Sequence, residues 1–219
     1  MTTADSSLES LARIEHPEYI LEKMQPFLEL MVYYHCAMLE VKTKLEVLDK
    51  GLALHSSRNP FESIKCRLKT PGSIIEKLKR KGYPLSLSSI EENLNDIAGV
   101  RVICSFPDDI YDLADSLCAQ DDVTVLERKD YIQNPKPNGY RSLHLVIQIP
   151  IFLSDGKKEM RVEVQFRTIA MDFWASLEHK VKYKKDICNP EQVAEELRQC
   201  AEAISLMDQR MQEIRNSIA

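Results

Sequence analysis

Long apolar runs are scarce in this sequence of 219 residues, and their scarcity argues against a membrane protein. The most apolar run, residues 27–41, is interrupted by Glu29, His35 and Glu40, so it is too polar to span a bilayer. Residues 1–15 contain no basic segment followed by an apolar one, so we expect no signal peptide. We therefore predict a cytoplasmic protein that does not associate with membranes.

Cysteine pairs with metal-binding spacing are also absent. The six cysteines are Cys36, Cys66, Cys104, Cys118, Cys188 and Cys200. None of them forms a CxxC motif or a Cys/His pair at zinc spacing, so we expect free thiols in a reducing compartment.

Several common catalytic motifs are missing as well. The sequence has no GxxxxGK[ST] loop, no GxGxxG, no HExxH and no GxSxG. No His is followed directly by Asp, so the sequence carries no His–Asp motif of a metal-dependent hydrolase. Whatever chemistry the chain performs has to be found in less common patterns.

An overall excess of basic charge is lacking, but basic residues gather in one segment. The 29 basic and 34 acidic residues give a net charge of −5, which argues against a general nucleic-acid coat. Between residues 65 and 81 only Glu76 is acidic, whereas the basic residues are Lys65, Arg67, Lys69, Lys77, Lys79, Arg80 and Lys81. A new helix begins inside this cluster, and a helix N-terminus flanked by Lys and Arg favours a polyphosphate. The alternative is a solvated helix face.

Turn residues and periodicity divide the chain into helices and strands. Pro26 and Gly51 bracket one long helix, since proline favours the first helical turn and glycine the C-cap. The segment 59–82 is broken at 70–72 and restarts as a helix, with Ser73 as the expected N-cap. Further helices are predicted at 89–96, 108–121, 171–184 and 189–219, and strands at 97–106, 123–132, 143–150 and 160–169. This order predicts an α+β fold with a mixed, roughly five-stranded β-sheet flanked by helices, and with N- and C-terminal helices.

Two of the predicted strands alternate in a way that leaves each with a polar face. In the strand 160–169, Glu163 and Gln165 point away from the apolar side chains of the same strand. In the strand 143–150, His144 points away from a row of leucines and isoleucines. We expect these three polar residues to line one cleft, although an exposed face of an antiparallel sheet would show the same pattern.

Two carboxylates stand out as candidate metal ligands. Asp96 precedes one predicted strand and Glu163 lies within another, so they could converge. Mg²⁺ that accompanies nucleotide phosphates is typically held by one or two carboxylates. Taken singly, either carboxylate is more often a surface residue or the partner in an ion pair.

The last helix carries a narrow apolar seam. Its members are Val193, Leu197, Cys200, Ile204, Met207, Met211, Ile214 and Ile218. Such a seam is typical of packing either against the rest of the chain or against another copy of the chain, and the sequence leaves both open.

In combination, five motifs resemble the synthetase domain of the RelA/SpoT homologue family. They are "RLKTPGSIIEKLKRK", "DIAGVRV", "RKDYIQNPKPNGYRSLHL", "VEVQFRT" and "MDFWASLEHKVKYK", within residues 59–185. The chain looks like a small alarmone synthetase with a nucleotidyltransferase-like fold. The resemblance implies transfer of pyrophosphate from ATP to the 3′-hydroxyl of GDP or GTP, with release of AMP, to make the (p)ppGpp alarmones of the stringent response. It implies no hydrolase activity.

The resemblance also implies a role for individual residues. The residues implied in ATP binding are Arg67, Lys69, Ser73, Lys77, Arg80 and Arg101, with Arg67 and Arg101 placed on either side of adenine. The residues implied in GDP or GTP binding are Arg128 or Lys129, Lys136, Asn138, Tyr140, His144 and Gln165, with Tyr140 stacked on guanine. Asp96 and Glu163 are implied as catalytic ligands of Mg²⁺, and Glu163 also as the group that activates the 3′-hydroxyl.

The same resemblance suggests how the chain is organised. We expect N-terminal helices in 1–58, the synthetase domain in 59–188 and a C-terminal oligomerisation helix in 189–219 that contributes to a homotetramer. Two alternatives remain: a nucleotidyltransferase that moves AMP, and a non-catalytic module that binds nucleotides or single-stranded RNA. The second of these gives no role to Asp96 and Glu163.

Overall fold

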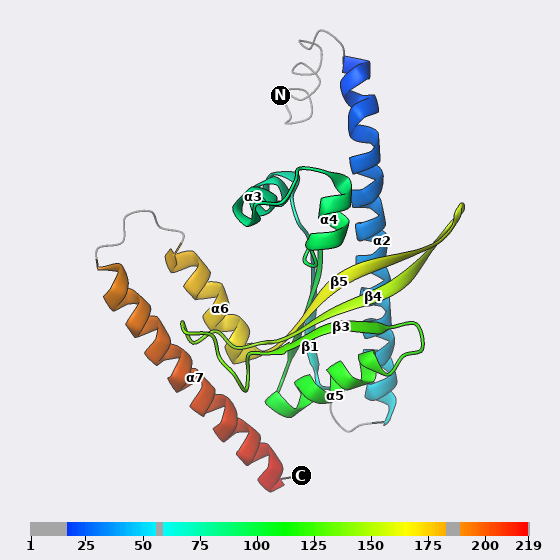
Figure 1. Ribbon diagram of the computed structural model, residues 1–219. Helices are drawn as coiled ribbons and strands as arrows, with labels where there is room; N and C mark the ends of the chain where they lie inside the picture. Colours follow the sequence, from blue (N-terminus) through cyan, green and yellow to red (C-terminus); the bar gives the residue numbers. More distant parts are fainter. Residues whose placement is uncertain (1–16, 56–58, 183–188, 219) are drawn as a thin grey trace, which may run out of the picture.

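The protein is an α+β structure built on one sheet, as predicted (Figure 1). The computed structural model describes residues 17–55, 59–182 and 189–218. The helices are α2 (Pro17–His55), α3 (Pro71–Lys81), α4 (Leu87–Asn93), α5 (Pro107–Cys118), α6 (Ile169–Lys182) and α7 (Pro190–Ile218). The strands are β1 (Phe61–Leu68), β2 (Ala98–Cys104), β3 (Thr124–Asp130), β4 (Leu143–Leu153) and β5 (Gly156–Thr168).

The five-stranded sheet is mixed and has the strand order β1-β2-β5-β4-β3. Strands β2 and β5 at its centre are parallel, whereas every other neighbouring pair is antiparallel. The parallel pairing sets Gly99 opposite Glu163 and Arg101 opposite Gln165. The β4–β5 hairpin in turn sets His144 opposite Gln165. Because directly paired residues share a face of a sheet, the predicted polar side chains of three strands gather on one side.

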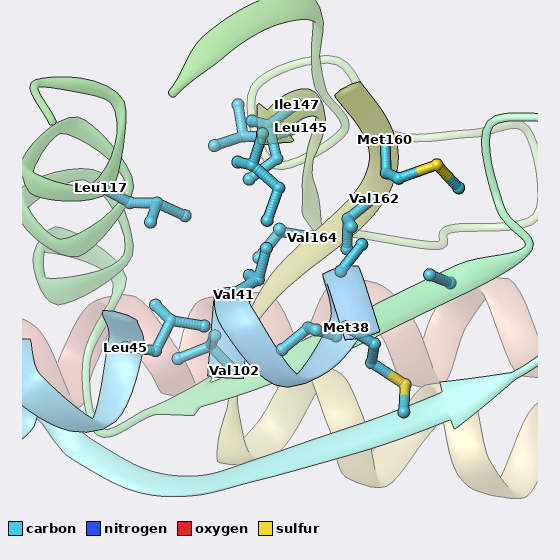
Figure 2. Packing of buried hydrophobic residues seen from close by; sticks show 14 of the residues in the cluster. Met38, Val41, Leu45, Val102, Leu117, Leu145, Ile147, Met160, Val162 and Val164 are labelled. Atoms are coloured by element: carbon cyan, nitrogen blue, oxygen red, sulfur yellow. The ribbon is translucent and has the colours of Figure 1, made fainter. Parts of the chain in front are cut away.

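The hydrophobic core lies on the other side of the sheet, under α2 and α5 (Figure 2). The buried side chains of α2 recur at helical spacing and are Leu30, Tyr34, Ala37, Met38, Val41 and Leu45. They meet the apolar face of the sheet, formed in part by Val102, Leu145, Ile147, Val162 and Val164. Helix α2 therefore shares one core with the sheet.

Helix α2 is longer than the sequence predicts. It begins at Pro17, passes through Pro26 and Gly51 and ends at His55. A glycine inside a helix costs only about 1 kcal/mol, which packing can offset. Leu48 and Leu52, on either side of Gly51, pack against the core, so the helix continues past the predicted C-cap.

The start of the basic segment is a strand, which corrects the expectation of a helix interrupted at 70–72. Residues 61–68 form β1, which pairs antiparallel with β2 along most of its length. The cap of α3 is Thr70, not Ser73: the Thr70 Oγ1 accepts a hydrogen bond from the Ser73 backbone N–H at 3.4 Å, and Pro71 occupies the first turn. The residues of β2 that pair with β1 lie 30 to 43 positions further along the chain, and no local pattern in β1 identifies them.

The C-terminal helix α7 packs on α6 and on the start of α5. Trp174 Nε1 donates to the Leu197 carbonyl at 2.8 Å, and Thr168 Oγ1 donates to Asp208 Oδ2 at 2.5 Å. Burial raises the pKa of the Asp208 carboxyl. The buried positions of α7 are Ala201 and Asp208, so the predicted seam is not the packing face over its C-terminal half. Met207, Met211, Ile214 and Ile218 of that seam are exposed.

The structure describes five of the six cysteines and the long helices. Cys36, Cys66, Cys104, Cys118 and Cys200 are all free, and Cys188 lies outside these residues. None of the helices described has the length and apolar character needed to cross a membrane. Residues 1–16, where we expect no signal peptide, are outside the described part of the chain.

Packing of α2 on the sheet predicts a strong dependence of stability on Leu45, whose exposed fraction is 0%. Leu45→Ala should lower the free energy of unfolding by about 2–5 kcal/mol, because it leaves a cavity in the shared core. Denaturant unfolding followed by circular dichroism measures this difference. Leu54→Ala makes the same substitution on the same helix at a position that is 82% exposed, and should change stability little. Equal losses in the two variants would contradict this account of the core.

Candidate nucleotide site

Two adjoining pockets occupy the polar face of the sheet. The first, of about 330 Å³, is lined by Lys65, Cys66, Arg67, Lys69, Asp96, Gly99, Val100, Arg101, Glu163 and Gln165. The second, of about 420 Å³, is bounded by α6 and lined by Arg67, Arg101, Tyr140, Arg167, Ala175, Ser176, Glu178, His179 and Lys180. Arg67 and Arg101 line both pockets, so the two spaces share a boundary of guanidinium groups.

Asp96 is the anionic centre of the first pocket. Its Oδ2 atom accepts from Lys69 Nζ at 2.9 Å and lies 2.7 Å from Lys77 Nζ. Burial alone would raise the pKa of Asp96, but the ammonium groups of Lys77 and Lys69 hold that pKa below its ordinary value. The other oxygen, Oδ1, is buried and has no hydrogen-bond partner within the described residues. A buried, ionised oxygen without a partner is a suitable ligand for a cation.

The basic residues of α3 approach the same carboxylate. Ser73, Lys77 and Arg80 are separated by four and three residues along the helix, so they share one of its faces. Lys77 of this face reaches Asp96, and Lys69 joins it from the segment between β1 and α3. Two lysines of the basic segment 65–81 therefore reach the carboxylate of the first pocket.

Glu163 lies on β5 beside this centre. Its Oε2 accepts from Gln165 Nε2 at 2.7 Å, and its Oε1 lies 3.6 Å from His144 Nδ1. Burial would raise the pKa of Glu163, yet His144 and Gln165 hold the pKa below its ordinary value. The negative charge of Asp96 acts in the opposite direction and raises the pKa of Glu163, so the two carboxylates interact.

These two carboxylates fit a Mg²⁺ ion that arrives with phosphates. Among the residues that the structure describes, no group of three or more His, Cys, Asp or Glu side chains could hold a metal. Asp96 and Glu163 would supply two ligands, since the Asp96 Oδ1 has no hydrogen-bond partner in the described part of the chain. Phosphate oxygens and water would complete the shell, as is usual for magnesium.

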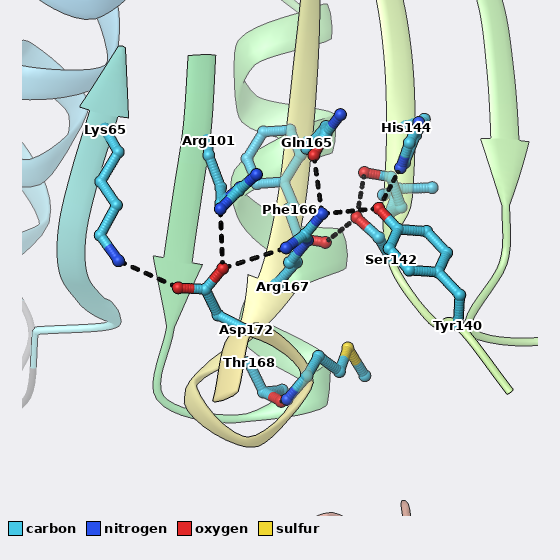
Figure 3. A network of polar contacts seen from close by, with 12 residues as sticks. Lys65, Arg101, Tyr140, Ser142, His144, Gln165, Phe166, Arg167, Thr168 and Asp172 are labelled. Atoms are coloured by element: carbon cyan, nitrogen blue, oxygen red, sulfur yellow. Dashed lines mark hydrogen bonds and ion pairs between the residues drawn. The ribbon is translucent and has the colours of Figure 1, made fainter. Parts of the chain in front are cut away.

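A third carboxylate, Asp172 in the first turn of α6, contacts three cations (Figure 3). Its Oδ1 accepts from Arg101 Nη1 at 3.1 Å and from Arg167 Nη1 at 3.0 Å. Its Oδ2 accepts from Lys65 Nζ at 3.0 Å. Burial would raise the pKa of Asp172, and these cations hold it below its ordinary value.

Arg167 connects Asp172 to the polar residues around Glu163 (Figure 3). Its Nη2 donates to Gln165 Oε1 at 2.9 Å and to the Tyr140 hydroxyl at 2.7 Å. The Tyr140 hydroxyl lies 2.8 Å from His144 Nε2. The Glu163 carboxylate can only accept, so His144 carries a proton on Nδ1, and in the neutral imidazole Nε2 then accepts from the Tyr140 hydroxyl. Two routes, one through Gln165 and one through Tyr140 and His144, thus link Arg167 to Glu163.

Tyr140 is presented by a loop at residues 131–142 that has its own hydrogen bonds. The Asn138 side chain accepts from the Tyr140 backbone N–H at 3.2 Å and donates to Glu178 Oε1 at 3.0 Å. Lys136 Nζ lies 4.6 Å from the centre of the Tyr131 ring and 4.9 Å from that of Tyr140. The loop is therefore held by α6 on one side and by cation–π contacts within it.

Gly139 brings the same loop against α7. Its backbone φ is +87°, and a Cβ at this position would lie 2.6 Å from the Cβ of Ala201. Arg141 adds hydrogen bonds to the carbonyls of Gly139 and Ala201 at 3.2 and 3.4 Å. Only glycine permits both this backbone conformation and this close approach.

The register of β3 separates the two basic residues that the sequence left undecided. Lys129 pairs with His144, whereas Arg128 pairs with Leu145. Lys129 therefore lies on the polar face, and Arg128 lies on the opposite face, where it bonds to Asp115 of α5 at 2.7 Å. The geometry favours Lys129 over Arg128 as a member of the site.

Sequence reasoning assigned no role to Asp172, Tyr131 or Arg167. The alternation of β5 continues to Arg167, but nothing local indicates that this side chain is 5% exposed and bonded on both sides. Asp172 lies 71 residues from Arg101 and 107 from Lys65 along the chain, so only the assembled fold brings them together.

Comparison with known proteins identifies the family of the chain. Residues 66–187 match the family model described as a region found in RelA / SpoT proteins. The chain is 40% identical to the GTP pyrophosphokinase YwaC of Bacillus subtilis, over 94% of this chain and 98% of that protein. It is also 40% identical to the GTP pyrophosphokinase YjbM of the same organism, over 86% of this chain and 88% of that protein.

Solved structures give the same result. The crystal structure of small alarmone synthetase 1 from Bacillus subtilis, bound to its product pppGpp, superposes with a TM-score of 0.81 at 39% identity and covers 89% of this chain and 98% of that one. A GTP pyrophosphokinase family protein from Streptococcus pneumoniae reaches a TM-score of 0.79 at 34% identity, over 88% of this chain and 94% of that one. The mixed sheet and its polar face are those of a nucleotide-binding transferase. The chain belongs to the RelA/SpoT family, which confirms the resemblance seen in its motifs.

The lysines around Asp96 predict how its pKa responds to substitution. Lys77→Met should move the pKa of Asp96 upwards, because burial then acts with one ammonium group fewer against it. With a folded pKa below the unfolded one, ionised Asp96 adds stability at neutral pH that is lost as pH falls through the folded pKa, and the variant should lose it at higher pH. NMR titration of the carboxyl carbon measures the shift. Lys79→Met, on an exposed position of the same helix, serves as control, and an identical Asp96 titration in both variants would contradict the prediction.

Proposed function

We propose that this protein is a GTP pyrophosphokinase that makes (p)ppGpp from ATP and GDP or GTP. The observation that carries the proposal is the pair Asp96 and Glu163, two interacting carboxylates beside a basic pocket in a chain of this family. The relatives that match nearly the whole chain are GTP pyrophosphokinases by name. We take 59–188 as the synthetase segment, with the N-terminal helices in 1–58 and the C-terminal helix in 189–219.

In the proposed reaction the 3′-oxygen of the guanosine nucleotide bonds to the β-phosphorus of ATP. The bond from that phosphorus to the oxygen bridging the α- and β-phosphates breaks, and AMP leaves with this oxygen. Catalysis of such a transfer depends on positioning and on neutralising charge. Lys69, Lys77 and Arg80, with Ser73, grip the donor phosphates, while Arg67 and Arg101 hold adenine at the boundary of the two pockets.

The acceptor nucleotide binds on the side of the loop 131–142. Tyr140 offers its ring to guanine, and Lys136, Asn138 and Lys129 surround the approach to it. The loop is already hydrogen-bonded, so little conformational entropy is lost when the nucleotide binds. His144 and Gln165 lie between this ring and Glu163.

Glu163 receives the proton of the 3′-hydroxyl. Its lowered pKa keeps it ionised at neutral pH, and the bond from Gln165 to Oε2 fixes its orientation. Asp96 and Glu163 would hold a Mg²⁺ ion that screens the charge of the transferred group. This position makes Glu163 the residue whose loss should affect transfer most.

The positions of the basic residues in the segment 65–81 favour binding of a small ligand over binding of a single-stranded RNA. Lys69 and Lys77 turn to Asp96, and Lys65 turns to Asp172, so these cations face the pocket rather than a long surface groove. We therefore propose nucleotides as the ligands, and the cytoplasm, where ATP and GTP are abundant, as the place of the reaction.

We also propose that copies of the chain form a homotetramer, with α7 as one contact. The exposed apolar residues Met207, Met211 and Ile214 lie on the side of α7 that its packing on α6 does not use. A narrow apolar stripe of this kind suits helix-to-helix association.

Transfer of label tests the enzymatic proposal. Purified protein with Mg²⁺, γ-labelled ATP and GDP should yield a labelled guanosine nucleotide and AMP, whereas a nucleotidyltransferase would release pyrophosphate. Glu163→Gln should reduce transfer by about 10²–10⁴-fold and leave ATP binding measurable, because the base and one metal ligand are lost. Glu159→Gln, on the same strand at an exposed position, should retain normal activity. Absence of label in any guanosine product of the unaltered protein would refute the proposal.

Sedimentation velocity tests the assembly. Met207→Glu with Met211→Glu should convert the tetramer to smaller species, because two charges would be buried in an apolar contact. Gln209→Glu adds a charge to the same helix at an exposed position and should leave the tetramer intact. A double variant that sediments like the unaltered protein would exclude α7 as the contact.

A further inference from the structure

We propose that Asp172 is a positioning residue that couples the donor half of the site to the acceptor half. The inference rests on the proposed function, since it assigns ATP to the side of Arg101 and the guanosine nucleotide to the side of Tyr140. Asp172 itself faces three protein cations and acts through them.

A single oxygen atom makes this connection. Asp172 Oδ1 accepts from Arg101 at 3.1 Å and from Arg167 at 3.0 Å, and the side chain of Asp172 is 10% exposed. Two guanidinium groups on one oxygen repel each other, and the pKa of Arg101 is lowered by burial and by the charge of Arg167. Each arginine therefore weakens the hold of the other on Asp172.

The two arginines lead to different halves of the site. Arg101 lines both pockets and its side chain is 35% exposed, whereas the side chain of Arg167 is 6% exposed. Arg167 holds the Tyr140 hydroxyl and Gln165, which in turn orients Glu163. Arg101 can thus exchange its bond to Asp172 for a bond to a ligand, whereas Arg167 is committed to the acceptor residues.

Binding of ATP consequently strengthens the binding of GDP or GTP in the acceptor half of the site. A nucleotide that draws the guanidinium of Arg101 to itself leaves Asp172 Oδ1 to Arg167 alone. The Asp172–Arg167 bond then tightens, and Tyr140 and Glu163 are held more firmly for the second substrate. Positive coupling between the two nucleotides follows, and by linkage it is reciprocal.

Binding measurements without turnover test this coupling. The dissociation constant of GDP is measured by calorimetry on the full chain, with and without a saturating α,β-methylene analogue of ATP. The analogue should tighten GDP binding by about fivefold or more in the unaltered protein. The ratio of the GDP dissociation constant without the analogue to that with it measures the coupling. In Asp172→Asn this ratio should fall to near one, while each nucleotide alone still binds. Because no pyrophosphate is transferred, the result is separate from success or failure of the labelling assay.

Two further variants make the outcome decisive. Arg167→Lys keeps the positive charge but cannot bond Asp172, Tyr140 and Gln165 at the same time, so the ratio should fall to near one in this variant too. This variant tests the proposal even if Asp172→Asn fails to fold. Asp122→Asn makes the matched substitution in a carboxylate that pairs with Lys44 and should keep the ratio. A ratio in Asp172→Asn or Arg167→Lys equal to that of the unaltered protein would overturn the proposal, as would a ratio of one in the unaltered protein.

Discussion

Parallel pairing of β2 with β5 is the constraint on which the rest of the site depends. It brings the segment that carries Asp96 and Arg101 alongside the one that carries Glu163 and Gln165, although more than sixty residues separate them. Burial of the opposite face under α2 decides which side chains remain on the polar face, since a slip of one residue would exchange the two sets. Hydrophobic burial far from the nucleotides thereby determines the arrangement of the charged groups.

The charged groups form two clusters, each with more cations than carboxylates. At Asp96, two ammonium groups pair with one carboxylate oxygen, and the other oxygen has no partner among the described residues. At Asp172, three cations share one carboxylate, so positive charge remains in excess. Buried charges are costly unless they are paired, and a polyphosphate can neutralise the excess of positive charge. The site therefore carries a positive charge that suits a polyphosphate ligand.

Most of the fold and part of the site could be predicted from the sequence, and the failures have a common cause. Alternation identified the polar face of β4 and β5 because it is a local pattern, and the motifs identified the family. β1 was missed because its pairing with β2 is not local, and Gly51 was taken for a helix end because the packing of Leu52 is invisible in the sequence. The side of the sheet on which Arg128 lies depended on a register that no single strand reveals.

Loop 131–142 and α7 meet where neither can hold a larger side chain. Gly139 faces Ala201, and one turn along the helix in either direction the corresponding positions are Arg198 and Ser205, both larger than alanine. A slide of α7 by one turn, about 5.4 Å, would drive one of these side chains into the backbone of the loop. The close contact at Gly139 therefore fixes the position of α7 along its own axis. Two small residues 62 positions apart, neither with any chemistry of its own, thus set how closely the loop and the helix can approach.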